Sequence, residues 1–180
     1  MTTRPPFDDI KSIWQATAVE RPQFSAVAGG SQYDVAIIGG GYTGLSTARY
    51  VARKGLSVIV LEASRIGWGA SGRNGGVVSA KFRLAYRDIA SRFGIDVARR
   101  MHDISIKAVA HVGELVRDYA IKDANYHATG SLRCAHNQVS LDAIKAECAW
   151  LNEALGDPAC SIQSAPQVAE ETGSNDFVGG

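Results

Sequence analysis

The sequence predicts an α/β fold that contains a strand–helix–strand unit, and three observations support that prediction. Residues 35–38 form a short β-branched apolar run, VAII, which suits a strand better than a helix. Three consecutive glycines lead into an Ala- and Leu-rich helical pattern at 45–54, which Gly55 ends. A second apolar run at 57–61 follows and stops at Glu62. Strand, glycine turn, helix and strand therefore occur in order within about thirty residues.

The glycine turn in this unit indicates a nucleotide site. Gly39, Gly41 and Gly44 have the G-x-G-x-x-G spacing, which is weak evidence alone because glycine turns are common. In this context the first glycine suits a tight turn, the second lets the backbone approach a pyrophosphate, and the third lets helix and strand pack closely. Glu62 lies 18 residues beyond Gly44, where a carboxylate accepts hydrogen bonds from an adenosine ribose. An ordinary solvated strand end is the alternative for Glu62, but the aligned elements favour a Rossmann-like dinucleotide-binding unit.

A glycine-rich loop follows the unit at residues 63–76. Five glycines fall within ten residues, beside Trp68 and the polar side chains of Ser71, Arg73 and Asn74. Glycine lets backbone amides approach a ligand, and the polar side chains supply directed hydrogen bonds. A flexible surface linker is the alternative. Because the loop directly follows the nucleotide unit, we expect it to contact the ligand.

Helical segments come next, and their order distinguishes between cofactors. Residues 83–93 are expected to form a short helix that ends at Gly94, and Asp96 is a plausible N-cap for a long amphipathic helix. The predicted buried stripe of that helix is Val97, Met101, Ile104, Ala108, Val112, Leu115 and Tyr119. A nicotinamide-binding domain would instead continue with alternating strands and helices. The pattern therefore favours a flavin-type architecture with insertions.

Secondary structure can also be predicted for the segments near both ends of the chain. Residues 1–32 are read as a leader, and Trp14 favours a leader that docks on the folded body over a disordered tail. One or two strands are expected at 125–135. A helix is expected from a cap at Ser140 to residue 155, with Leu141, Ile144, Cys148 and Leu151 on its buried face, and another helix at 165–171.

Composition narrows the functional classes. The formal net charge of +1 gives no reason to expect nucleic acid, and the basic residues between 81 and 100 are interpreted as a solvated helix face. Three widely spaced cysteines and four histidines show no zinc, disulfide or triad spacing, so no metal site is predicted. Residues 1–10 do not resemble a signal peptide, and no run approaches the ~18 apolar residues that cross a bilayer. We therefore expect a cytoplasmic protein without a membrane partner.

Three regions of the sequence resemble a known enzyme family. The stretch DVAIIGGGYTGLS at 34–46 resembles the opening of the FAD-dependent D-amino-acid oxidase/glycine oxidase superfamily. LEA at 61–63, followed by IGWGASGRNGG at 66–76, looks like the gamma-glutamylputrescine oxidoreductase branch of that superfamily. The leader stretch WQATA at 14–18 is similar to the leader of the same branch.

The resemblance implies FAD as the cofactor and a set of residues that hold it. In the order of the chain they are Gly39, Gly41, Tyr42, Thr43, Gly44, Glu62, Ala63, Ser71, Arg73, Asn74, Gly75 and Gly76. The glycines at 39, 41 and 44 would hold the pyrophosphate, Glu62 the ribose, and residues 71–76 would run beside the pyrophosphate and the isoalloxazine. Some relatives attach FAD through Cys or His, and this loop contains neither.

The resemblance also implies a reaction. The expected substrate is a small amine or amino acid, whose carbon next to nitrogen gives a hydride to flavin N5. The imine then hydrolyses, and dioxygen is the expected electron acceptor, which yields hydrogen peroxide. No catalytic residue can be assigned. Arg73 is a candidate for binding a substrate carboxylate, but a cofactor contact or a loop-stiffening hydrogen bond fits it better.

The predicted domain organisation has three parts. A leader arm at 1–32 precedes the N-terminal part of the FAD-binding domain, with inserted helices, at 33–124. The start of a mixed α+β substrate domain follows at 125–180. Members of the superfamily are about twice this length, so the chain is expected to be an N-terminal portion.

Two alternative functions stay open from the sequence. They are an NAD(P)-dependent dehydrogenase and a truncated, non-catalytic nucleotide-binding module. No oligomeric state is predicted.

Overall fold

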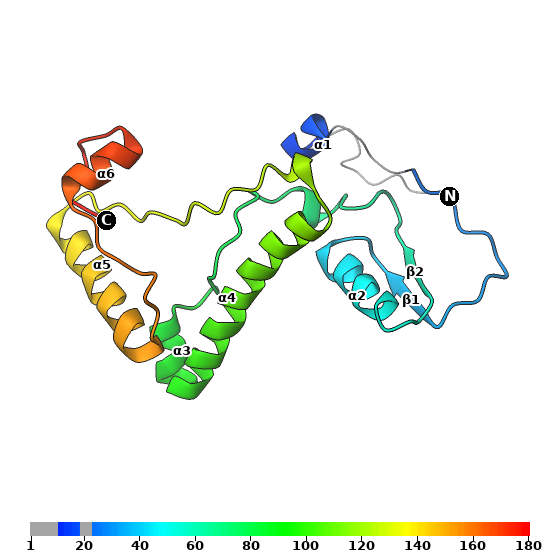
Figure 1. Cartoon of the computed structure of the whole chain (residues 1–180), viewed down its shortest axis with the longest axis horizontal. Helices are drawn as coiled ribbons and strands as arrows, with labels where there is room; N and C mark the ends of the chain where they lie inside the picture. Colours follow the sequence, from blue (N-terminus) through cyan, green and yellow to red (C-terminus); the bar gives the residue numbers. More distant parts are fainter. Residues whose placement is uncertain (1–10, 19–22) are drawn as a thin grey trace. The chain divides into compact units, whose positions relative to one another are not determined.

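The computed structural model describes residues 11–18 and 23–180 (Figure 1). Residues 1–10, which carry the expectation that there is no signal peptide, lie outside the described residues. The chain forms two compact units, the first extending to Val77 and the second covering Val78–Gly180. The predicted domain limits at 32/33 and 124/125 stay predictions.

The first unit contains the strand–helix–strand arrangement that the sequence predicts. Its elements are α1 (Ile13–Thr17), β1 (Val35–Ile38), α2 (Tyr42–Ala52), β2 (Val58–Leu61) and the 3₁₀ turn η1 (Ala70–Gly72). The strands β1 and β2 pair in parallel, with Val35 opposite Val58 and Ile38 opposite Leu61. Asp34 and Ser57 join the strand starts, since the Asp34 carboxylate accepts hydrogen bonds from both the amide and the hydroxyl of Ser57 at 2.8 and 2.7 Å. The fold is therefore α/β, as predicted.

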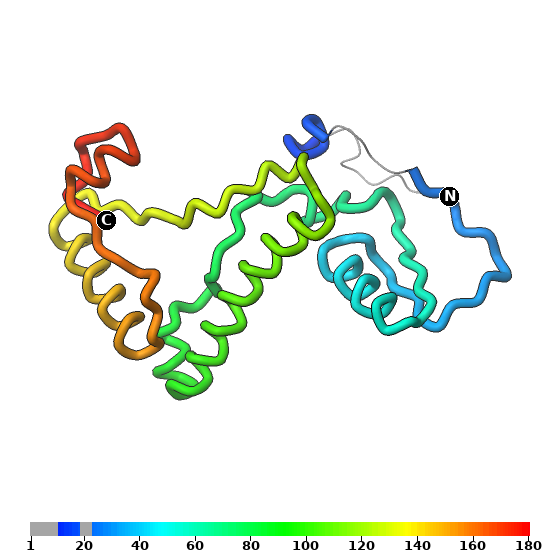
Figure 2. The backbone as a smooth tube through the Cα atoms, viewed as in Figure 1, coloured from blue at the N-terminus to red at the C-terminus, as the bar shows by residue number. Residues whose placement is uncertain are grey.

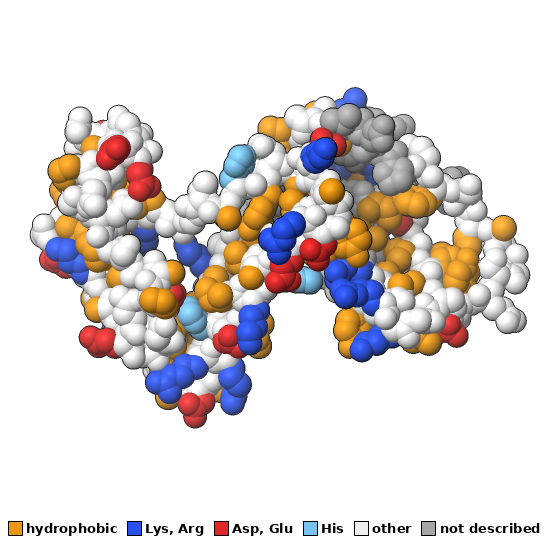
Figure 3. All heavy atoms as spheres, viewed as in Figure 1, with side chains coloured by type: hydrophobic (Ala, Val, Ile, Leu, Met, Phe, Trp, Pro, Cys, Tyr) orange, Lys and Arg blue, Asp and Glu red, His pale blue; other side chains and the backbone are white. Residues whose placement is uncertain are grey.

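The sheet of the first unit buries one face better than the other. Along β1, Val35 and Ile37 are partly buried, whereas Ala36 and Ile38 are exposed, because alternate side chains point to opposite faces. Helix α2 packs along both strands (Figure 1). Figure 3 shows apolar side chains at the surface of this unit, and the side chain of Ile38 is 89% exposed.

The second unit is a helical assembly, which the tube view shows most simply (Figure 2). Its elements are α3 (Tyr86–Phe93), α4 (Ile95–Asp118), the 3₁₀ turn η2 (Lys122–Ala124), α5 (Gln138–Trp150), the π-helical turn η3 (Leu151–Leu155) and α6 (Ala165–Thr172). Tyr86 and Ile89 of α3 form its core with Ala98 of α4, and Trp150 packs against them from α5. None of the helices in the described part of the chain combines the length and apolar content needed to cross a bilayer.

Two predicted helix caps are wrong, although the helices exist. Helix α4 begins after Gly94, whose φ of 89° is a backbone conformation that glycine adopts readily. Asp96 lies within the first turn and is therefore not the N-cap. Helix α5 begins after Asn137, whose side-chain oxygen accepts a hydrogen bond from the Ser140 amide at 2.8 Å. Asn137 is therefore the N-cap, and Ser140, which was predicted to be the N-cap, supplies the amide that Asn137 binds. The predicted end at residue 155 is confirmed, since Gly156 adopts the left-handed conformation that stops η3.

The buried stripe predicted for α4 is only partly right. Val97, Met101, Val112 and Leu115 are partly buried, but Ile104 and Tyr119 are 60% and 57% exposed and Ala108 is exposed. The fully buried positions of α4 are Ala98 and Ser105. Ser105 shares a 2.6 Å hydrogen bond with the Tyr86 hydroxyl, which explains why a polar side chain is buried there.

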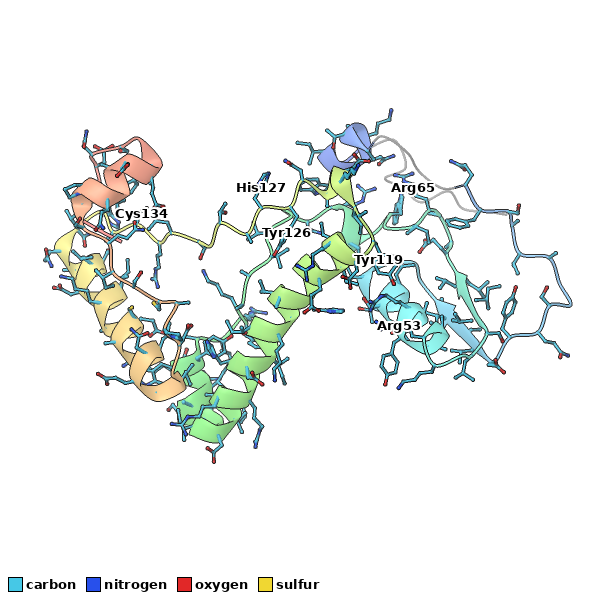
Figure 4. All side chains as sticks on the ribbon, viewed as in Figure 1. Arg53, Arg65, Tyr119, Tyr126, His127 and Cys134 are labelled. Carbon is cyan, nitrogen blue, oxygen red and sulfur yellow. The ribbon has the colours of Figure 1, made fainter. Side chains whose placement is uncertain are left out.

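The strands predicted at 125–135 are absent from the described residues. One isolated bridge pairs Ala135 with Gly179, and the chain before it makes no ladder. Alternating polar and apolar side chains at 125–132 mimic a strand, but a strand also needs a partner for its backbone groups. Tyr126 instead packs on Gly113 of α4, where its ring lies 3.4 Å from the position of a Cβ (Figure 4).

Two of the basic residues between 81 and 100 contact neighbouring segments as well as solvent. Arg87 donates to the Ala146 carbonyl at 3.0 Å and lies over the Trp150 ring, and Arg99 donates to the Ala154 carbonyl at 2.9 Å. These two side chains tie α3 and α4 to the α5–η3 segment. The side chains of the cluster are nevertheless all exposed, as predicted, although Lys81 and Arg83 lie before α3 and not on a helix.

Candidate functional site

The candidate site is built on the turn between β1 and α2. Gly39 ends the strand with a φ of +102° and donates its amide to the Leu61 carbonyl at 2.8 Å. Helix α2 starts after Gly41, which makes no side-chain cap. The N-terminus of α2 therefore presents backbone amides and the positive end of its dipole at the carboxyl end of the parallel strands.

Gly44 brings the helix onto the strand. A Cβ at this position would overlap the Gly39 carbonyl oxygen and lie 3.4 Å from Cγ2 of Ile37. A Cβ on Gly41 would lie 2.9 Å from the Ser71 hydroxyl oxygen. The close helix–strand approach expected at the third glycine is thus present, and the backbone of the turn is kept free of side chains.

Glu62 faces the same turn from the end of β2. One carboxylate oxygen accepts a hydrogen bond from the Gly40 amide at 2.7 Å, and the other accepts one from the Ser64 amide at 3.0 Å. An ionised carboxylate offers about four acceptor positions, so about two remain for another donor. Ala63 follows Glu62 and is exposed. The acidic residue is therefore ordered beside the glycine turn and retains acceptor capacity for a sugar hydroxyl.

The glycine-rich loop is fixed to the start of α2 by its own polar side chains. The Ser71 hydroxyl accepts a hydrogen bond from the Tyr42 amide at 3.0 Å, so it satisfies one of the free amides at the helix start. Asn74 donates to the Ser71 carbonyl at 2.8 Å and accepts from the Gly76 amide at 2.8 Å. These bonds show an ordered loop in place of the flexible linker that was the alternative.

Arg73 has a structural role within the loop. Its Nε donates to the Trp68 carbonyl at 2.8 Å, and its guanidinium lies 5.0 Å from the centre of the Trp68 ring. This contact is the loop-stiffening hydrogen bond considered for Arg73 from the sequence. The indole Nε1 of Trp68 is buried and has no hydrogen-bond partner among the described residues.

The structure brings the predicted site residues together in three groups of the first unit. The first group is the turn and helix start, the second follows β2, and the third belongs to the loop. Their members are Gly39, Gly41, Tyr42, Thr43 and Gly44; Glu62 and Ala63; and Ser71, Arg73, Asn74, Gly75 and Gly76. Sequence reasoning missed Gly40, whose buried amide binds Glu62 and whose Cβ would overlap Ile66. It also missed Gly72, where a Cβ would overlap the Gly67 carbonyl. Both lie outside the G-x-G-x-x-G positions, although the dense run of glycines was a visible signal.

The arrangement fits a dinucleotide cofactor such as FAD. The bare turn and the α2 amides suit a pyrophosphate, and Glu62 suits a ribose. The structure supports this fit, because the missing Cβ at Gly44 lets α2 pack against Gly39 and so places the first amides of the helix at the end of β1.

Titratable side chains of the second unit form structural contacts. His102 lies 3.1 Å from the Asp157 carboxylate and packs edge-on against Tyr86. Burial, then a hydrogen bond with Cys148, raises the pKa of the Cys160 thiol to about 12. The raised pKa disfavours the thiolate, so Cys160 is not an activated nucleophile, and no catalytic residue is assigned.

Comparisons with known proteins agree with this geometry. Residues 34–180 match the model of the family described as FAD dependent oxidoreductase. The chain is 33% identical to gamma-glutamylputrescine oxidoreductase of Escherichia coli K12 over 96% of its length. It is 40% identical to a probable oxidoreductase OrdL of Rhizobium meliloti over 67% of its length. It is also 35% identical to one component of the anaerobic glycerol-3-phosphate dehydrogenase of Escherichia coli K12 over 70% of its length.

The matched regions are parts of longer relatives. The matches span 40% of the Escherichia coli gamma-glutamylputrescine oxidoreductase, 28% of the Rhizobium protein and 23% of the dehydrogenase component. No solved structure matches the chain.

Proposed function

Because the chain belongs to the FAD-dependent oxidoreductase family, with FAD as its cofactor, we propose that the protein oxidises a small amine or amino acid at a C–N bond. The support for an amine is the relative matched over 96% of this chain, which is named for gamma-glutamylputrescine. FAD supplies the capacity to accept two electrons as a hydride, and dioxygen is the proposed final acceptor. The cytoplasm is the proposed compartment.

The observation that supports FAD binding most directly is the cradle at Gly44. Its Cβ-free approach to Gly39 allows the α2 amides to lie at the strand end, where a pyrophosphate would bind. We assign Gly39, Gly41, Tyr42, Thr43 and Gly44 to the pyrophosphate. Glu62 and Ala63 are assigned to the adenosine side.

The loop supplies the second part of the proposed site. Ser71 and Asn74 hold residues 71–76 against the start of α2, so the loop backbone lies beside the proposed pyrophosphate position. Arg73 is engaged with Trp68 through Nε, and its terminal nitrogens are proposed to contact the cofactor. Gly75 and Gly76 complete the proposed set, because they leave the backbone accessible.

A nicotinamide-dependent dehydrogenase is opposed by the element order. After Glu62 the chain continues into the glycine-rich loop and then α3 and α4, whereas a nicotinamide domain would continue with further strands and helices. This order supports the flavin over the nicotinamide.

The test measures FAD uptake and peroxide release on one protein preparation. The purified protein is incubated with FAD, separated from free flavin, and scanned for flavin absorbance. It is then assayed for hydrogen peroxide with γ-glutamylputrescine, putrescine and a set of amino acids, with glycerol 3-phosphate as the non-amine control. We expect bound FAD and peroxide from at least one amine. A protein that binds NAD(P)H but no FAD, or one that oxidises only the control, contradicts the proposal.

A further inference from the structure

Helix α1 contacts the glycine-rich loop through two neighbouring side chains. The indole Nε1 of Trp14 donates to the Asn74 carbonyl at 2.7 Å, and the Gln15 side-chain oxygen accepts from Arg65 at 2.7 Å. Arg65 follows β2, and Figure 4 labels it. A cavity of about 130 Å³ is lined by side chains from both α1 and this loop. The leader thus meets the loop through directed bonds.

The ring of Trp14 also explains why residue 76 is glycine. A Cβ on Gly76 would lie 2.7 and 2.8 Å from two carbons of the indole ring. The φ of Gly76 is +73°, which side-chain-bearing residues adopt rarely. The backbone therefore turns at Gly76 in a way that leaves room for Trp14.

Asn74 connects this contact with the candidate cofactor site. Its carbonyl accepts the Trp14 bond, while its side chain bonds to the Ser71 carbonyl and the Gly76 amide. Ser71 in turn caps the Tyr42 amide at the start of α2. A continuous series of hydrogen bonds runs from α1 to the helix start proposed to bind the pyrophosphate.

Contact between the two segments helps to order both of them. Helix α1 has five residues, and a helix of that length is unstable in water without tertiary contacts. The loop has five glycines within ten residues, so fixing its backbone costs more conformational entropy than fixing an ordinary loop. Docking of Trp14 offsets part of this cost before any ligand binds.

We propose that α1 acts as a clamp on residues 70–76, with Trp14 as a positioning residue that prepares the loop for FAD. This inference rests on the proposed function only where it places FAD beside the loop. Ordering of the loop by Trp14 is a property of the protein without ligand. Trp14 is assigned no contact with FAD or substrate.

The experiment compares Trp14→Phe and Trp14→Ala with Trp150→Phe as the matched control. Phe retains a ring beside Gly76 but cannot donate to Asn74, and Ala removes both contacts. Trp150 packs against the core of the second unit, whereas residues 70–76 belong to the first unit. Hydrogen exchange of residues 70–76 is measured without FAD, and the dissociation constant for FAD is measured on the same preparations.

We expect exchange at 70–76 to be about fivefold faster in Trp14→Phe, as loss of one hydrogen bond predicts, and at least about tenfold faster in Trp14→Ala. The dissociation constant for FAD should rise by similar factors, while Trp150→Phe should match the parent in both measurements. Unchanged exchange at 70–76 in both Trp14 variants would overturn the clamp. Faster exchange with unchanged FAD affinity would overturn the positioning role.

Two further outcomes separate this inference from the proposed function. If the parent protein binds no FAD, the proposed function fails, while the exchange data still decide whether α1 clamps the loop. If Trp14→Ala does not fold, Trp14→Phe is judged against Trp150→Phe, since each exchanges one aromatic ring for another.

Discussion

At Gly44 the chain leaves no room for a single added methyl group. We expect Gly44→Ala to push α2 away from Gly39, which should weaken FAD binding by at least about tenfold and lower the free energy of unfolding by about 1–3 kcal/mol. FAD titration and urea unfolding measure the two effects. Gly29→Ala is the matched control, because a Cβ there meets nothing within 4 Å. Equal FAD affinity in both variants would contradict the proposed cradle.

The Cys160 thiol gives a second test at the scale of one residue. Its pKa is raised to about 12, chiefly by burial, whereas the unfolded thiol has a value near 9.0. The neutral thiol is the form that the folded state favours, so its contribution to stability is complete below pH 9 and is lost as pH rises from 9 towards 12.

We therefore expect Cys160 to react slowly with iodoacetamide. At pH 9 the folded protein should be labelled at Cys160 at least about tenfold more slowly than the urea-unfolded protein, because the thiolate is the reactive form. Mass spectrometry of the labelled peptides gives the two rates. Cys134 in the same samples shows whether the reagent is active, and equal rates at Cys160 in both states would contradict the assigned burial.

Among the elements, the start of α5 allows a test of which residue is its N-cap: Asn137, as in the structure, or Ser140, as predicted from the sequence. Asn137→Ala removes the side-chain oxygen that accepts from the Ser140 amide, so it should reduce the free energy of unfolding by about 1 kcal/mol. Ser140→Ala keeps that amide and should change stability by less than about 0.5 kcal/mol. Chemical denaturation of both variants measures the difference, and the reverse order would restore Ser140 as the cap.

The elements that the sequence predicts best are those defined by local pattern. The run at 35–38 identifies β1, and the glycine turn predicts that a helix follows, because strand propensity and glycine geometry act over a few residues. Helix α2 begins at Tyr42, however, and not at residue 45 as predicted. Helix α6 was also predictable, since Ser164, Pro166 and Gly173 mark its ends.

The errors concern features that depend on partners distant in sequence. Residues 125–134 alternate like a strand, yet no neighbouring strand pairs with them in the described chain. In α4, the exposed Ile104 and the buried Ser105 follow from where α3 packs, which helical periodicity does not reveal. In the candidate site, the bond from Tyr42 to Ser71 spans 29 residues, so the sequence suggested the loop as a ligand contact but not how the loop is held.

Across the whole molecule, the two compact units divide packing and proposed binding between them. The buried apolar side chains of the described chain all lie in the second unit, including Ile89, Ala98 and Val168. The first unit contains the proposed FAD site, but its strand residues are at most partly buried, and parallel strands are usually covered on both faces. Ligand binding should therefore contribute a large share of the stability of the first unit.

This division predicts which backbone amides FAD protects from hydrogen exchange. At an FAD concentration of about 100 times the dissociation constant, binding should stabilise the folded state of the first unit by about 2.7 kcal/mol. Hydrogen exchange in β1, α2 and β2 should then slow by about a hundredfold, if those amides exchange through opening of that unit. Amides around Ile89 and Ala98 should change much less, because every residue assigned to FAD lies before Val77.

Hydrogen exchange with and without FAD on one preparation measures both units at once. The Gly44→Ala variant is the control: at the same FAD concentration, about tenfold weaker binding should reduce the slowing in the first unit from about a hundredfold to about tenfold. Equal slowing in the two units would contradict the assignment of the ligand contacts to the first unit alone. Protection confined to the second unit would overturn the proposed site, since no residue assigned to FAD lies there. Protection of β1, α2 and β2 that also extends through residues 70–76 would show that the ligand engages the glycine turn and the loop together.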